Sequence, residues 1–294
     1  MKQKILSLLA FLIIACHTEL SCLPLAGYSI TQRWTQGDCE LLVLEDGDGA
    51  KALLKMICDP DPDEQLLLVV DYLACWIAES CALPINRVRL VSPQDNPYGG
   101  LATLHEWASG CSIEDHAPWD DFDLQQRYRH PDSPYYEIYG PLPSERQGLN
   151  RAVLGTMTKH PQLAQIAALD TFLGNADRSK ANLYYDWEND SFVGIDLAAS
   201  LRSPLTAAAI RQLNEMKAFG FSDGELRALR IYKSTLENLY ASVSVRDFSD
   251  WLREFTGVLG LQDSGQVYAK EAQWQHNYVL TPALLHLLEE ILAD

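Results

Sequence analysis

Two acids and an amide stand out between residues 168 and 200. Asp177 lies in a polar loop after an apolar helix, Asn182 follows five residues later, and Asp196 comes at the end of a predicted strand. A hairpin between Asn182 and Asp196 would bring the three side chains to one point. One carboxylate there can accept a proton from a substrate hydroxyl. The amide oxygen and the second carboxylate can hold Mg²⁺ against the phosphates of a nucleotide.

The loop GNADR at 174–178, followed by Asn182 and by Ile-Asp at 195–196, resembles the catalytic and metal loops of the protein-kinase-like superfamily. It is similar to the phosphatidylinositol 3/4-kinase branch and to the bacterial HipA-type kinases. Ser179 departs from these families, which usually have His there, and Leu197 follows the metal-binding Asp in place of Phe.

The resemblance implies that ATP and Mg²⁺ are cofactors, that Asp177 is the catalytic base and that Asn182 and Asp196 are metal ligands. Arg178 and Lys180 would add positive charge beside the reacting phosphate. The alternative is that the loop has no catalytic role and is rich in Asn, Asp, Gly and Ser only because these residues favour turns. A turn alone does not explain the later Asp196.

A lysine in an apolar strand is the expected phosphate contact. Two β-like runs, 39–44 and 52–57, flank a turn containing Gly and predict a hairpin. Lys55 lies within the second run, where a buried ammonium needs an anionic partner. The kinase resemblance implies that the phosphates of ATP are that partner. If the register of the hairpin is shifted, Lys51 is the alternative phosphate contact. Lys55 pointing out from an edge strand is the other interpretation.

An acidic cap at 59–63 predicts a long amphipathic helix that runs from Glu64 to about Ser80. The kinase resemblance implies that Glu64 orients Lys55, and Asp71 lies two turns further on a similar face. A carboxylate that only interacts with the helix dipole is an equal alternative for Glu64.

The next strands lead to a hinge. The segment 82–91 predicts a loop and a strand, and 101–108 predicts a further strand. The kinase resemblance implies that this strand ends in the hinge, whose backbone groups near His105 to Trp107, including Glu106, would hydrogen-bond adenine. The region 109–146 has weak periodicity and predicts a long irregular connection that is a candidate for substrate contacts.

The second half is predicted to be mainly helical. Helices between 146 and 173 are expected to break at His160-Pro161 and to deliver Asp177. Asp170, on their last turn, is either a second acid or a helix-face residue. Further helices follow, the last of which is predicted to start at Pro282.

These elements predict an α+β fold, and the resemblance implies that it is bilobal and protein-kinase-like. The small, β-rich lobe with one helix would cover residues 23–107, and the larger, mainly helical lobe would cover residues 108–294.

Composition limits the partners. The 294 residues contain 47% hydrophobic residues, which is typical of a globular protein. Asp and Glu outnumber Lys and Arg by 40 to 23, for a net charge of −17. Such a surface repels nucleic acid, so nucleic acid is not an expected partner.

Residues 1–22 predict a leader. A basic start precedes an apolar segment from Ile5 to Ala15, which is typical of a secretory signal and too short for an ordinary membrane span. The sequence before Cys16 resembles a bacterial lipobox, so lipidation of Cys16 would anchor the protein to a membrane. Cleavage near Ser21 and a buried N-terminal helix are the alternatives.

Without Cys16, six cysteines remain, an even number that is compatible with disulfides after export. Cys75 and Cys81 lie in an apolar helical stretch and are expected to be buried free thiols. The spacing of Cys and His does not match a zinc site.

The sequence therefore predicts an exported, ATP- and Mg-dependent kinase that phosphorylates a hydroxyl of a lipid, protein or small molecule. Transfer of AMP is a related possibility. Only Arg202 and Arg211 offer positive charge after Asp196, which disfavours a phosphoinositide. The alternative is an exported or lipid-anchored binding protein without catalysis.

Overall fold

The computed structural model describes residues 25–36, 39–57, 62–113, 149–179, 181–186, 188–258, 260 and 265–293. The expected leader with Cys16, Lys180, and most of the connection at 109–146 lie outside these residues. The predicted α+β class, with a β-rich N-terminal part and a helical C-terminal part, is confirmed. The chain divides into two compact units: Met1–Leu68 with Val88–Trp107, and Val69–Arg87 with Ala108–Asp294.

The first unit is built on a five-stranded antiparallel sheet with the order β1-β2-β3-β5-β4. The expected hairpin is β2–β3, and the side chain of Asp46 closes its turn by accepting from the backbone N–H groups of Asp48 and Ala50. The elements of this unit are η1 (Leu25–Gly27), β1 (Ser29–Gln36), β2 (Cys39–Glu45), β3 (Lys51–Ile57), β4 (Val88–Val91) and β5 (Ala102–Glu106).

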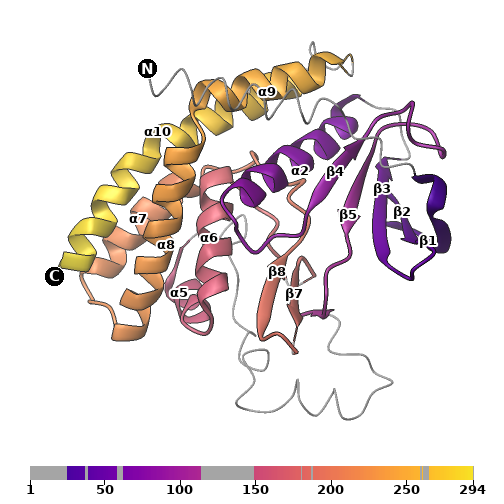
Figure 1. The fold of residues 1–294 in the computed structure, drawn as a ribbon. Helices are drawn as coiled ribbons and strands as arrows, with labels where there is room; N and C mark the ends of the chain where they lie inside the picture. The colour runs from indigo at the N-terminus through magenta and orange to yellow at the C-terminus, as the bar shows by residue number, and fades with distance from the viewer. Residues whose placement is uncertain are drawn as a thin grey trace, which may run out of the picture. The chain divides into compact units, whose positions relative to one another are not determined.

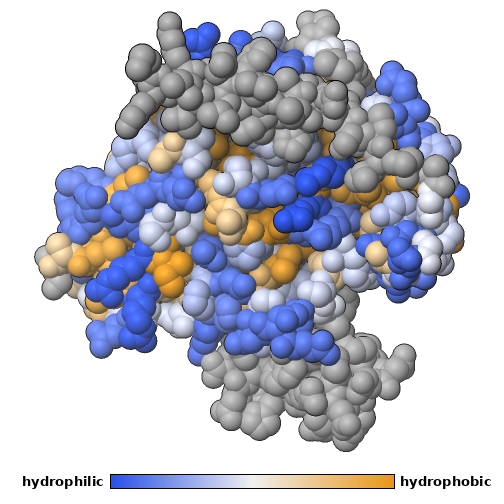
Figure 2. Space-filling model, viewed as in Figure 1, coloured by the Kyte–Doolittle hydropathy of each residue, from blue (hydrophilic) through white to orange (hydrophobic). Residues whose placement is uncertain are grey.

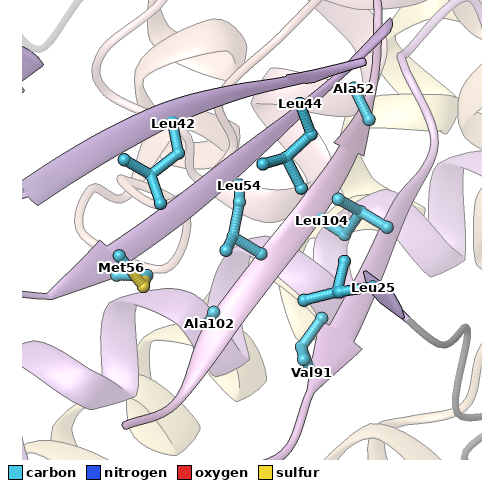
Figure 3. Close-up of a cluster of buried hydrophobic side chains, with 9 residues drawn as sticks. All are labelled: Leu25, Leu42, Leu44, Ala52, Leu54, Met56, Val91, Ala102 and Leu104. Carbon is cyan, nitrogen blue, oxygen red and sulfur yellow. The ribbon is translucent and has the colours of Figure 1, made fainter. Parts of the chain in front are cut away.

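One face of this sheet carries the hydrophobic core of the first unit. Because side chains alternate along a strand, every second residue of β3 joins this core, and Lys55 lies on the opposite face. Figure 3 shows the buried cluster, which consists of Leu25, Leu42, Leu44, Ala52, Leu54, Met56, Val91, Ala102 and Leu104.

Helix α2 (Pro62–Ser80) starts and ends where the acidic cap and the apolar periodicity predicted. Its residues up to Leu68 belong to the first unit and the remainder to the second. The buried thiols of Cys75 and Cys81 are free, as expected.

The second unit combines a small antiparallel sheet, of order β6-β7-β8, with a set of helices (Figure 1). Its further elements are β6 (Cys111–Ser112), α5 (Arg151–Met157), α6 (Pro161–Leu173), β7 (Leu183–Asp186), β8 (Ser191–Gly194), α7 (Leu205–Lys217), α8 (Asp223–Ser242), α9 (Val245–Val258) and α10 (Gly265–Ala293).

Helix α6 is the centre of the second unit. It begins at the predicted break, where His160 caps it and Pro161 is its first residue. It packs against α5, α7, α8, α10 and β8, and every residue from Ile166 to Leu173 is buried (Figure 1). The ring of Phe172 contacts that of Trp274 on α10, with centroids 5.1 Å apart.

The prediction that the last helix starts at Pro282 is wrong. Helix α10 runs from Gly265 to Ala293 with Pro282 inside it. Buried residues continue along one face on both sides of the proline, including Asn277, Thr281 and Leu284. The packing of this face outweighs the one backbone hydrogen bond that proline removes.

On the face shown in Figure 2, hydrophilic residues and several hydrophobic areas lie side by side among the described residues. Of the helices in the described ranges, none combines the length and apolar character needed to span a bilayer.

Candidate active site

The loop that carries Asp177 starts where α6 ends. Gly174 ends the helix with φ of +65°, and a Cβ there would lie 2.3 Å from the carbonyl oxygen of Ser203. The next residue, Asn175, is fully buried; its amide donates to Asp170 at 2.8 Å and its oxygen accepts from the N–H of Asp177 at 3.3 Å. Glycine and this asparagine therefore fix the backbone from which the exposed carboxylate of Asp177 projects.

Arg178 and Asp170 form a buried ion pair whose side chains are both 0% exposed. Nε and Nη2 of Arg178 donate to the two carboxylate oxygens at 3.0 and 3.1 Å. Burial alone would lower the pKa of Arg178, but the charge of Asp170 and its hydrogen bonds raise the pKa above its usual value. These hydrogen bonds satisfy the guanidinium and the carboxylate, as the burial of such a pair requires.

The third nitrogen of Arg178 joins two loops. Its Nη1 donates to the carbonyl oxygen of Asn182 at 2.6 Å and to that of Ile195 at 2.7 Å. This placement differs from the expectation that Arg178 lies beside the reacting phosphate. Its side chain is 0% exposed, and its contacts hold the loop that carries Asp177 to the residue before Asp196.

Asn182 bridges the same two loops. Its Nδ2 donates to the carbonyl oxygen of Asp177 at 2.9 Å, and its own carbonyl oxygen accepts from the N–H of Ile195 at 3.1 Å. The side-chain nitrogen is thus committed to the loop, and the side-chain oxygen is the atom that a cation can bind.

Asp196 follows β8 with an unusual backbone. Its φ is +53°, its side chain is half-buried, and its Oδ1 accepts from the N–H of Ala198 at 3.2 Å. The charge of Asp196 contributes to raising the pKa of Arg178 and that of Cys75, so its carboxylate lies within electrostatic range of both.

The end of β8 leaves no room for a larger residue. A Cβ on Gly194 would lie 2.6 Å from Cδ1 of Ile85 and 3.2 Å from Nη1 of Arg178. The backbone of Gly194 pairs with Pro84 and Asn86. The segment after α2 and the guanidinium of Arg178 together frame the strand that leads to Asp196.

The structure thus gathers the loops of Asp177, Asn182 and Asp196 through direct hydrogen bonds within the second unit. Across the residues that the structure describes, no group of three or more His, Cys, Asp and Glu side chains is placed to hold a metal ion. One carboxylate and one amide fit a Mg²⁺ ion that keeps phosphate and water oxygens as its other ligands.

The first unit carries the remaining expected residues. Lys55 is 8% exposed on β3, where it pairs in register with Thr103 of β5. Thr103 Oγ1 lies 2.9 Å from Nε2 of His105, and both side chains are buried. Lys51, the alternative, is exposed with its Nζ 5.8 Å from the ring centroid of Trp107.

The expected adenine contacts lie at the end of β5, and the acid expected to orient Lys55 lies near the start of α2. Glu106 is the exposed last residue of β5 and is followed by Trp107, which is 46% exposed. Glu64 lies half-buried in the first turns of α2.

Sequence reasoning missed the partners of two buried acids. Asp170 was expected to be a second acid or a plain helix-face residue, and Asp71 an alternative partner for Lys55. In the structure Asp170 pairs with Arg178, and Asp71 accepts a hydrogen bond from the N–H of Leu197. The available signal was an acid inside an otherwise apolar helical run, which needs a donor when it is buried.

No protein-family model matches the chain, and no curated protein matches it. Among solved structures, it is similar to the Helicobacter pylori proinflammatory kinase CtkA, with a TM-score of 0.48 and 11% identity over 91% of this chain and 96% of that chain. It is also similar to the Rio2 kinase of Chaetomium thermophilum in complex with ADP and Mg²⁺ (TM-score 0.39, 11% identity, 90% and 74% covered).

A third similar structure is the PknI kinase domain of Mycobacterium tuberculosis, with a TM-score of 0.36 and 11% identity over 85% of this chain and 96% of that chain. At this level of similarity, the function has to be argued from the residues of this chain.

Proposed function

We propose that this protein is a phosphotransferase of the kinase type, which moves the γ-phosphoryl group of ATP to a hydroxyl with the help of Mg²⁺. The observation that carries the proposal is the hydrogen-bonded junction of the two loops. Asn182 bonds to the backbone of Asp177 and Ile195, and Arg178 holds both Asn182 and Ile195. A plain turn needs none of these contacts.

Asp177 is the proposed base. Its carboxylate is exposed, while Asn175 and Asn182 fix its backbone on both sides. As the hydroxyl oxygen forms a bond to phosphorus, the bond from phosphorus to the ADP oxygen breaks and the hydroxyl proton moves to Asp177. A fixed base on an accessible loop is what such a reaction requires of the protein.

Asn182 Oδ1 and the carboxylate of Asp196 are the proposed Mg²⁺ ligands. Bound Mg²⁺ would neutralise the charge of the phosphates. The second unit also places the buried carboxylate of Asp170 against the guanidinium of Arg178, and the buried carboxylate of Asp71 against the N–H of Leu197, next to Asp196.

In the first unit, Lys55 is the proposed phosphate contact and Glu64 its orienting acid. Lys55 is 8% exposed on a central strand, and an ammonium in such a place can bind phosphate oxygens. The backbone of Glu106 and Trp107 is the proposed adenine contact.

The phosphatidylinositol 3/4-kinase-like or HipA-like branch remains our preferred family placement, because the loop GNADR, followed by Asn182 and Asp196, resembles the loops of that branch. The acceptor is a hydroxyl of a protein, small molecule or lipid. Arg202 and Arg211 are both exposed after Asp196, but two charges on a protein of net charge −17 are a weak site for an inositol phosphate. Export through the leader and anchoring by lipidated Cys16 are part of this proposal.

The test uses ATP labelled at the γ- or the α-phosphate, incubated with the protein and a host-cell extract. Wild type is expected to transfer γ-label, and Asp177→Ala to lose this transfer. Glu188→Gln, which changes an exposed carboxylate in the β7–β8 turn, is the matched control and should transfer normally. Transfer of α-label instead would identify AMP transfer.

Thermal shift separates catalysis from binding. Mg·ATP should raise the melting temperature of wild type, and Asp196→Ala should lose this rise. A rise in wild type without any label transfer would favour a non-catalytic nucleotide-binding protein. Absence of both would reject the proposed function.

A further inference from the structure

Asp71 is a buried acid on α2 that the proposed reaction does not use. Its side chain is 0% exposed, and its helix neighbours Leu68, Val69 and Val70 are apolar and buried. Its Oδ1 accepts from the N–H of Leu197 at 2.8 Å, a contact between residues 126 positions apart. Both residues belong to the second unit.

This contact fixes one of the two peptide planes that flank Asp196. The N–H of Leu197 belongs to the plane after Asp196, and Asp71 holds it. The carbonyl of Ile195 belongs to the plane before Asp196, and Arg178 holds it at 2.7 Å. The backbone angles of Asp196 are therefore set from both sides by buried charged groups.

Asp196 needs such restraint. Its φ of +53° lies in the left-handed region, which is unfavourable for a residue other than glycine. A conformation of this kind persists only when surrounding contacts determine it. The direction of the carboxylate follows from that backbone, because its Oδ1 bonds to the N–H of Ala198 two residues on.

Cys75, one turn after Asp71 on α2, contacts the carboxylate of Asp71. Its Sγ donates to Oδ1 of Asp71 at 3.7 Å. Burial raises the pKa of the Cys75 thiol, and the charges of Asp71 and Asp196 raise it further. The thiol therefore stays protonated and serves as a second donor to Asp71.

We propose that Asp71 is the positioning residue of Asp196: by holding the N–H of Leu197, it fixes the carboxylate in the direction that binds Mg²⁺. The metal part of this inference rests on the proposed function. The positioning part concerns the loop itself and has its own measurement.

Two readouts on the full chain test the inference. Amide hydrogen exchange at Leu197, followed by NMR, reports the hydrogen bond. The affinity for Mn²⁺ in the presence of a non-hydrolysable ATP analogue is measured by electron paramagnetic resonance. It reports whether the carboxylate of Asp196 points in the direction that binds the metal. Asp71→Ala removes the acceptor, and Asp71→Asn keeps an acceptor oxygen without the charge. Cys75→Ala, one turn further on the same helix and equally buried, is the matched control.

In Asp71→Ala, exchange at Leu197 is expected to accelerate by about tenfold or more, and the Mn²⁺ dissociation constant to rise about 10- to 100-fold, as for other residues that support metal ligands. Asp71→Asn should recover most of both properties. Cys75→Ala should stay within about threefold of wild type, because a thiol at this distance is a weak donor.

Unchanged exchange at Leu197 in Asp71→Ala would overturn the inference, and so would an Asp71→Asn variant as defective as Asp71→Ala. If Asp71→Ala does not fold, amide exchange in wild type tests the hydrogen bond between Leu197 and Asp71. A Leu197 amide that exchanges as fast as an unprotected amide would contradict that hydrogen bond. If wild type binds no Mn²⁺ with nucleotide, the proposed function is rejected, while the exchange rate still shows whether Asp71 holds the loop.

Discussion

Nη1 of Arg178 donates to the carbonyl oxygen of Ile195 at 2.7 Å, and Ile195 immediately precedes Asp196. The guanidinium thereby connects the proposed catalytic loop with the proposed metal loop, while Asp170 compensates its charge in the interior. The junction therefore gives Arg178 a structural role next to Asp177, the proposed base.

Arg178→Met is expected to destabilise the protein strongly. The change leaves the carboxylate of Asp170 buried without its cation, and loss of one partner of a buried pair costs about 3–5 kcal/mol. The free energy of unfolding in urea measures the effect. Arg230→Met, which removes an exposed arginine of α8, should change it by no more than about 0.5 kcal/mol. Equal losses in the two variants would show that the pair does not stabilise the junction.

Gly174→Ala is expected to loosen the start of the catalytic loop. The new Cβ would lie 2.3 Å from the carbonyl oxygen of Ser203 and 2.4 Å from Nδ2 of Asn277, at a φ of +65° that alanine adopts with strain. We expect a loss of about 2 kcal/mol or more in the free energy of unfolding.

The matched control for this change is Gly155→Ala. Gly155 lies inside α5, and a Cβ there meets nothing within 4 Å. Alanine should therefore stabilise that helix by about 0.5–1 kcal/mol. A destabilised Gly155→Ala, or a Gly174→Ala variant as stable as wild type, would contradict the geometry at the end of α6.

Lys55→Met and Lys51→Met distinguish the two candidate lysines. Lys55→Met should lower turnover about 100- to 1,000-fold, the usual effect of removing one charge contact to a reacting group. Lys51→Met removes only an exposed contact to Trp107 and should retain turnover. The reverse order of the two activities would assign the phosphate contact to Lys51.

The parts that the sequence predicted are those with local signals. Two β-like apolar runs around a turn containing Gly predicted the β2–β3 hairpin, the acidic cap predicted the start of α2 near Glu64, and Pro161 marked the break before α6. Each of these signals lies within a few residues of the structure that it determines, so one sequence is enough to read it.

The contacts that organise the site join residues far apart in the chain. Asp71 and Leu197 are separated by 126 positions, and Arg178 and Ile195 by 17. Only the folded chain shows which buried acid meets which donor. Pro282 failed as a start signal for the same reason, since packing of α10 decides the helix there.

The last prediction concerns Lys270 on α10, whose Nζ donates to the carbonyl oxygen of Ser200 at 2.9 Å. Burial, and then the positive charge of Arg202, lower the pKa of Lys270 to about 8. In the unfolded chain a lysine holds its proton up to about pH 10.4. Between about pH 8 and pH 10 the unfolded state therefore binds more protons, and the contribution of Lys270 to stability rises with pH by at most about 1.4 kcal/mol per unit.

The measurement is the free energy of unfolding of wild type minus that of Lys270→Met, from about pH 7 to pH 10. The difference should increase with pH above about 8. Lys233→Met is the control, because the pKa of Lys233 is shifted in the opposite direction: a hydrogen bond to Glu237 raises it. The contribution of Lys233 should stay constant over this range and decline only at higher pH, as the folded protein loses that proton. Parallel curves for wild type and Lys270→Met would show that Lys270 keeps its proton in the folded state.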